Sequence, residues 1–125
     1  MNISLFNIVA VALGGMAGSV LRYIVGALLL QKMGSAFPWG TFAVNLVGCL
    51  LIGLAAGHLT KNPHFQPWYL LLATGFCGGF TTFSAFSYES VMMFRSEQYG
   101  MLAFYIFASL LLGTCLTALG YTFSK

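Results

Sequence analysis

The chain has 125 residues, of which 59% are hydrophobic and only 6% are charged, and its formal net charge is +3. A soluble domain of this length carries about 25% charged residues, so too few charges remain here to solvate a globular surface. The small, scattered positive charge argues against a nucleic-acid partner. We therefore expect a lipid-embedded membrane protein with a single domain over residues 1–125.

Four stretches are long and apolar enough to cross a bilayer, which takes about 20 mostly apolar residues. They are residues 4–30, 41–59, 68–94 and 101–123. The first is too long for the apolar part of a signal peptide and lacks a basic segment before it, so we expect it to be retained. The pattern predicts an all-α, multi-pass integral membrane protein with four transmembrane helices.

The first span contains Arg22, the only basic residue well inside an apolar run. A charge at membrane depth is a candidate functional residue by default. Arg22 either extends to the nearer interface or draws anions into a vestibule, and the sequence leaves both open.

The second span carries Asn45 near its middle, and Thr41 lies one turn earlier on the same helical face. Burying an amide without partners costs roughly 2–7 kcal/mol. Asn45 therefore either bonds to a neighbouring helix or donates its NH₂ group to a passing anion.

The third span contains GFCGGFTTFSAFSYES, residues 75–90. Its glycines weaken a helix and its hydroxyls offer competing hydrogen bonds, so we expect a break between Gly78 and Thr82. A break at this depth must be buried in protein or line a polar cavity, and the freed carbonyls of broken helices bind ions. A continuous, glycine-kinked helix is the alternative, and the density of the cluster favours the ion site.

Phe80, Phe83 and Phe86 recur every three residues of this segment and share a broad helical face. Packing against protein or lipid is one interpretation. The other uses the positive edge of the phenyl ring, which attracts an anion weakly.

The fourth span places Tyr105, Ser109 and Thr117 in one polar stripe on an apolar helix. Such a stripe faces either protein, where it forms interhelical hydrogen bonds, or water, where it lines a pore.

The chain shows no carboxylate pair, metal-ligand spacing or Ser/His/Asp set at membrane depth, so no enzyme is predicted. The predicted polar lining holds hydrogen-bond donors and one basic side chain but no buried acid. This favours an anion pathway over a cation pathway.

The basic residues give almost no orientation signal. Lys61 and Lys125 lie on the side that holds both ends of the four-span chain, and Lys32 and Arg95 lie on the other, with Arg22 near that second side. Because Lys and Arg bias sets topology, a balanced chain can insert either way up and pair as an antiparallel, dual-topology homodimer. A fixed topology set by weaker signals is the alternative. Four spans form a thin bundle, so we expect an oligomer in both cases.

Three segments, GGMAGSVLRY (14–23), WGTFAVNLVG (39–48) and TGFCGGFTTFSAFS (74–87), closely resemble the Fluc, or CrcB, family of fluoride channels. The resemblance extends over the whole chain in length, span number and motif order. It implies a passive, fluoride-selective channel that exports cytoplasmic fluoride across the inner (plasma) membrane and so confers fluoride resistance. It also implies an antiparallel homodimer with two pores and a structural sodium ion at the dimer interface.

The resemblance also assigns roles to residues of this chain. The fluoride pore would be formed by Asn45, Phe83, Phe86, Thr41, Tyr105, Ser109 and Thr117, and Arg22 would belong to the vestibule. The backbone carbonyls of Gly78 and Thr81 would hold the sodium ion. Gly113 stands where some members carry a serine, so the lining is less polar there.

Two other functions fit a small membrane protein with little charge bias. A small multidrug-resistance-type, dual-topology transporter needs a carboxylate in its first span, and residues 3–30 contain no Asp or Glu. A non-transporting assembly subunit would use the glycines only for packing.

Overall fold

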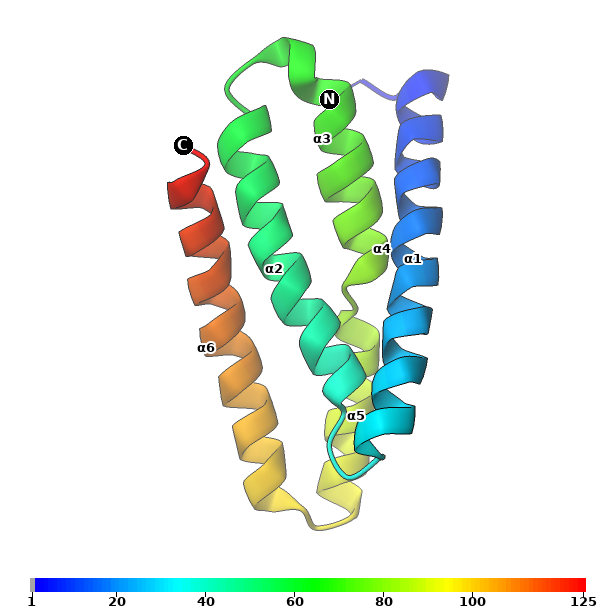
Figure 1. Ribbon diagram of the computed structural model, residues 1–125, viewed down its shortest axis with the longest axis vertical. Coiled ribbons are helices and arrows are strands. Elements are labelled where there is room, and N and C mark those ends of the chain that lie inside the picture. The colour runs from blue at the N-terminus through cyan, green and yellow to red at the C-terminus, as the bar shows by residue number, and fades with distance from the viewer. Residues whose placement is uncertain (1) are drawn as a thin grey trace.

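The computed structural model describes residues 2–125, and the secondary structure of this range is helical. In chain order the elements are α1 (Leu5–Met33), α2 (Trp39–Leu59), η1 (Pro63–Phe65), α3 (Gln66–Tyr69), η2 (Leu70–Cys77), α4 (Gly78–Phe80), α5 (Phe83–Arg95) and α6 (Tyr99–Phe123) (Figure 1). Elements η1 to α5 form the third long apolar segment, Pro63–Arg95, which begins five residues before the predicted span 68–94.

Four segments are long and apolar enough to cross a membrane: Leu5–Met33, Trp39–Leu59, Pro63–Arg95 and Tyr99–Phe123. The prediction of four helices that are long and apolar enough to cross a membrane is confirmed. The observed second and fourth helices each begin two residues before the predicted span, at Trp39 and Tyr99. These additional residues are an interfacial aromatic and its neighbour, which extend the helix toward the membrane surface.

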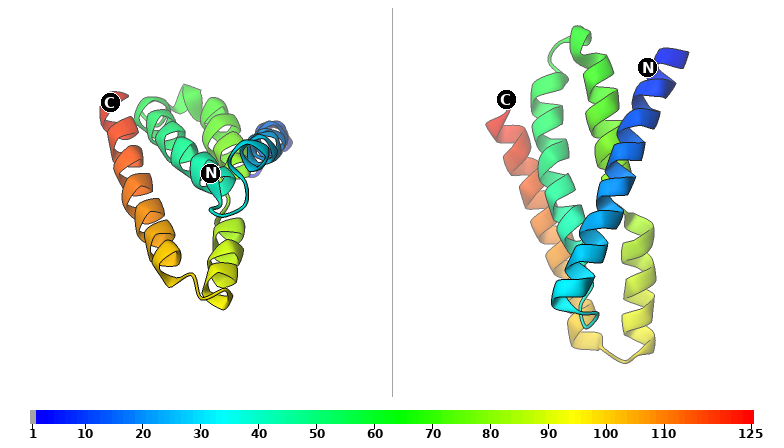
Figure 2. Two further views of the ribbon diagram at one scale, coloured as in Figure 1. Left: turned by 60° about the horizontal axis from the view of Figure 1, so that its bottom comes forward. Right: turned by 45° about the vertical axis from the view of Figure 1, so that its right-hand side comes forward.

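Both termini and the α2–η1 connection lie at one end of the bundle, and the α1–α2 and α5–α6 connections lie at the other (Figure 1). Helix α2 packs along α6, and α1 packs along η2 and α4. Helix α5 leaves this bundle, as the two views of Figure 2 show. Its contacts with other helices are chiefly with α6. The half of the third span that follows the break therefore has one side open in the single chain.

Glycines allow the backbones of α1 and η2 to touch. A Cβ atom on Gly14 would lie 2.0 Å from the Leu71 carbonyl oxygen, and one on Gly18 would lie 2.1 Å from the Phe76 carbonyl oxygen. Small residues permit this approach where lipid supplies no hydrophobic drive between helices. These two glycines of the first span therefore pack helices together.

An aromatic cluster closes the end of the bundle near the α1–α2 connection. Phe37 packs edge-on against Phe42 and Tyr105, with ring centroids 5.5 Å and 5.4 Å apart. Tyr105 is completely buried, and Met93 from α5 joins the same cluster. This cluster fixes the beginning of α2 and of α6 relative to α5.

Candidate functional site

The third span breaks at two threonines. Helix α4 ends at Phe80, Thr81 and Thr82 adopt extended conformations, and α5 begins at Phe83. The break predicted between Gly78 and Thr82 is therefore present, and the alternative of a continuous kinked helix is wrong. The glycines do not cause the break, since Gly78 and Gly79 are helical. Gly79 instead packs against the backbone of Gly15 on α1.

Asn45 bridges the break by pairing with the backbone of Thr82. The Thr82 N–H donates to Asn45 Oδ1 at 2.8 Å, and Asn45 Nδ2 donates to the Thr82 carbonyl at 3.2 Å. The side chain thus satisfies a donor and an acceptor that the break frees. The amide nitrogen carries two hydrogens, so one remains for another acceptor.

Two further side chains cap the ends created by the break. Thr82 Oγ1 accepts a hydrogen bond from the Ala85 N–H at 3.2 Å and caps the N-terminus of α5. Arg22 Nε donates to the Gly79 carbonyl at 2.9 Å, which places a cation at the C-terminal end of the helix before the break. Arg22 therefore reaches across to the third span instead of extending to the nearer interface.

The hydrogen bonds at the break remove the helical partners of the two carbonyls that are expected to hold sodium. In a continuous α-helix the Thr82 N–H donates to the Gly78 carbonyl and the Ala85 N–H donates to the Thr81 carbonyl. Both N–H groups are diverted, to Asn45 and to the Thr82 side chain. Gly78 is exposed, and apart from its chain neighbours and the backbone of its own helix, no atom lies within 4 Å of a Cβ built on it. The two carbonyls thus fit the donor set of a hard cation.

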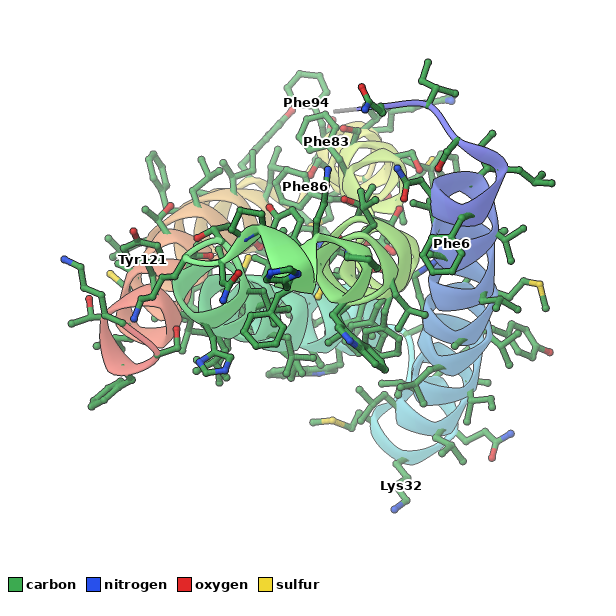
Figure 3. All side chains as sticks on the ribbon, turned by 90° about the horizontal axis from the view of Figure 1, so that it is seen from above. Phe6, Lys32, Phe83, Phe86, Phe94 and Tyr121 are labelled. Carbon is green, nitrogen blue, oxygen red and sulfur yellow. The ribbon has the colours of Figure 1, made fainter. Side chains whose placement is uncertain are left out.

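The three phenylalanines have different surroundings. Phe83 is 78% exposed and lies beside Phe86 (Figure 3), and their ring centroids are 5.9 Å apart. The Phe86 centroid in turn lies 5.0 Å from that of Tyr105. Phe80 is only 4% exposed and stacks on Phe76 at 5.5 Å. Phe80 is therefore a packing residue, whereas Phe83 and Phe86 stand beside the break.

Three cavities lie next to one another, because each has a lining residue in common with the next. The first, of about 430 Å³, is lined by Arg22 and Thr82, and the second, of about 540 Å³, by Thr82, Asn45 and Ser109. The third, of about 620 Å³, is lined by Ser109 and Thr117. The break and the fourth-helix stripe therefore border three adjacent cavities, and Phe83 and Phe86 also line the second one.

The stripe on α6 is not uniform. Thr117 donates to the Cys49 carbonyl at 3.0 Å, and Tyr105 donates to Glu89. The buried Ser109 Oγ has no hydrogen-bond partner among residues 2–125. Gly113 lines the third cavity. Ser109 is thus the member of the stripe whose hydroxyl is available to a ligand.

Glu89 is the site residue that the sequence analysis missed. Thr41 Oγ1 donates to Glu89 Oε1 and Tyr105 OH donates to Glu89 Oε2, both at 2.6 Å. The expectation was that the lining holds no buried acid, and Glu89 is only half-buried, yet its carboxylate contacts two of the predicted pore residues. A signal was present, since Glu89 is one of only two acids in the chain and falls inside the predicted span 68–94.

Comparison with known proteins places this chain in a family. The model of a family described as "CrcB-like protein, Camphor Resistance (CrcB)" matches residues 9–121. The chain is 44% identical to the "Fluoride-specific ion channel FluC" of Acidobacterium capsulatum over 88% of this chain and 89% of the relative. It is 52% identical to the protein of that name from Rhizobium etli, over 79% and 80% of the two chains. The protein of that name from Flavobacterium psychrophilum is 43% identical over 92% of this chain and 94% of the relative. This multi-pass membrane protein belongs to the CrcB family.

Proposed function

We propose that the protein is a passive, fluoride-selective ion channel that exports cytoplasmic fluoride across the plasma membrane. The observation that carries the proposal is the name of its relatives, fluoride-specific ion channel, at 43–52% identity over most of both chains. The adjacent cavities and the hydrogen-bond donors that line them support it. The multidrug-transporter alternative is not favoured, and the relatives are named as channels, not enzymes.

A channel suffices for export because the membrane potential supplies the driving force. Undissociated hydrogen fluoride crosses membranes and releases fluoride at cytoplasmic pH. An inside-negative potential then drives the anion outward with about 2.3 kcal/mol per charge per 100 mV. No coupled energy source is needed for this step.

The donors of the site suit an anion that must shed and regain its hydration. Arg22 lines the first cavity and supplies positive charge. The spare amide hydrogen of Asn45 and the unpaired hydroxyl of Ser109 follow in the second cavity, where ring edges of Phe83 and Phe86 add weak attraction. Several weak sites permit conduction because an ion that binds too tightly does not leave.

The functional unit in this proposal is an antiparallel homodimer. The large exposed surface of Phe83 and the open side of α5 support it, because a second chain would cover both. The near balance of basic residues between the two ends supports opposite insertion of the two copies. Each pore would then be completed by residues of both chains.

A structural sodium ion at the axis of this dimer is the second part of the proposal. Two copies bring together four carbonyls, from Gly78 and Thr81 of each chain, and carbonyl oxygens suit a small, hard cation. The ion would hold the two broken helices together. Replacing sodium by potassium or N-methylglucamine should lower the temperature at which the purified dimer unfolds. Equal stability in all three salts would contradict the ion site.

Fluoride efflux from liposomes tests the proposed function. Vesicles loaded with potassium fluoride and given valinomycin should release fluoride to an electrode when they contain the protein, and protein-free vesicles should not. Vesicles loaded with chloride should release little of it. Folded, reconstituted protein without fluoride efflux would support the assembly subunit. Proton-coupled uptake of an organic cation would support the multidrug transporter.

A further inference from the structure

The carboxylate of Glu89 receives one hydroxyl on each of its oxygens. Thr41 on α2 donates to Oε1 and Tyr105 on α6 donates to Oε2, each at 2.6 Å, so the carboxylate joins three helices. Distances of about 2.5–2.7 Å are typical of a hydroxyl that donates to an ionised carboxylate. Glu89 and Thr41 also line a cavity of about 630 Å³ at the end of the bundle. Thr41 lines the Arg22 cavity as well, so the two spaces adjoin.

Hydroxyl chemistry limits what Thr41 and Tyr105 can do while Glu89 is in place. A hydroxyl group has a single proton to donate, and an ionised carboxylate only accepts. Both protons therefore point at Glu89, and neither is available to a passing anion. Two hydroxyl protons that converge on one negatively charged group form an anion-binding pair, and in this structure the bound anion is the protein's own side chain.

We propose that Glu89 is a tethered anion that competes with fluoride for the hydroxyl pair of Thr41 and Tyr105. The inference rests on the proposed channel function. Fluoride can accept these two protons only when the carboxylate turns away, and a side-chain rotation toward the adjoining 630 Å³ cavity is enough for that. The competition lowers the affinity of the pair for fluoride, so an ion that reaches it is released again.

The test compares how flux saturates with fluoride in wild-type protein and in Glu89→Gln. Glutamine keeps the shape, but its NH₂ group donates, so one of the two hydroxyls loses its acceptor and its proton becomes available. We expect the half-saturating fluoride concentration to fall about tenfold, the factor given by one hydrogen bond to a charged group. Glu97→Gln is the matched control, because Glu97 is the other acid and lies exposed in the α5–α6 connection. It should leave the half-saturating concentration unchanged.

Removing a hydroxyl should have the opposite effect. Tyr105→Phe in the wild-type background should raise the half-saturating concentration, and Tyr105→Phe or Thr41→Val combined with Glu89→Gln should reverse much of the gain. These shifts distinguish a competing carboxylate from a purely structural one. Loss of a purely structural hydrogen bond changes the dimer yield and the maximal flux, but it does not change the half-saturating fluoride concentration. Gel filtration of every variant verifies the assembled state.

Each outcome decides the inference. An unchanged or raised half-saturating concentration in Glu89→Gln overturns it. If Glu89→Gln does not assemble, Tyr105→Phe decides, and an unchanged value there overturns the inference too. Wild-type protein without fluoride flux would instead refute the proposed function, so the two failures are distinguishable.

Discussion

Asn45 shows how one side chain serves both the backbone and the ion path. Its oxygen accepts from the Thr82 N–H and its nitrogen donates to the Thr82 carbonyl, so both halves of the amide are needed. An aspartate at this position keeps the acceptor but replaces the donor with a second acceptor that faces the carbonyl. The helix break therefore depends on an amide, and a carboxylate of the same shape does not replace it.

We expect Asn45→Asp to destabilise the protein by roughly 1–3 kcal/mol, the cost of a buried polar group left without its partner. It should also abolish fluoride flux, because it adds negative charge to the second cavity. Asn62→Asp is the matched control, since Asn62 only accepts a hydrogen bond, from the His64 N–H at 3.1 Å. Thermal unfolding in detergent measures the first effect and liposome efflux the second. Similar losses in both variants would contradict the role of the amide.

The phenylalanines beside the break give a second prediction at this scale. Phe83→Ile and Phe86→Ile should each reduce fluoride flux strongly while the dimer still assembles, because isoleucine has no ring edge to attract an anion. Phe80→Leu should keep most of the flux and cost about 1–2 kcal/mol of stability, because Phe80 is buried against Phe76. The measurements are liposome efflux and gel filtration. Wild-type flux in both isoleucine variants would show that the rings only pack.

Single residues were predictable where their own chemistry is unusual for a membrane span. Asn45 and Arg22 stand out because a polar group in lipid needs a partner. The role of Glu89 was not predictable, since its partners lie 48 and 16 residues away in the chain and meet it only after folding. For the same reason, the sequence did not show which hydroxyls of α6 already donate to other groups of the protein. The roles of the predicted pore residues in fluoride conduction remain predictions.

At the scale of elements, the third span combines a π-helix, a short α-helix, an extended break and a second α-helix. The break was predictable because hydroxyls that compete for backbone bonds gather there. The π-helix over Leu70–Cys77 was not, because its change in hydrogen-bond register leaves no mark in the composition of an apolar segment. Its backbone lies directly against α1, so the contact between the two elements depends on glycine.

Gly14→Ala should therefore disrupt this contact. The added Cβ would lie 2.0 Å from the Leu71 carbonyl oxygen and 2.8 Å from the Phe76 nitrogen, and backbone atoms cannot turn aside as a side chain can. We expect a loss of about 1–3 kcal/mol or more, typical of overpacking. Gly26→Ala on the same helix is the control, because no atom of another element lies within 4 Å of its added Cβ. Equal thermal stability of the two variants would show that α1 and η2 can separate without cost.

At the scale of the whole molecule, the basic residues are divided almost evenly between the two ends of the bundle. Lys61 and Lys125 belong to the end that holds both termini, and Lys32 and Arg95 belong to the opposite end (Figure 1). The number of spans and the balance of charge follow from composition and loop position alone. The pairing of two chains does not, because it depends on the shape of the surface that α5 leaves open.

The last prediction tests opposite insertion of the two copies. Lysines introduced into the loop at residues 60–67, for example His64→Lys with Gln66→Lys, should fix one orientation because basic loops stay cytoplasmic. If the pore requires an antiparallel pair, this variant alone should lose fluoride flux. Co-expression with a copy that carries lysines at the α5–α6 connection should restore it, because two oppositely biased chains can then pair. His64→Gln, with Gln66 left in place, serves as the neutral control and should leave flux unchanged. Full activity of the lysine variant by itself, with its fixed orientation verified by accessibility labelling, would refute the antiparallel dimer.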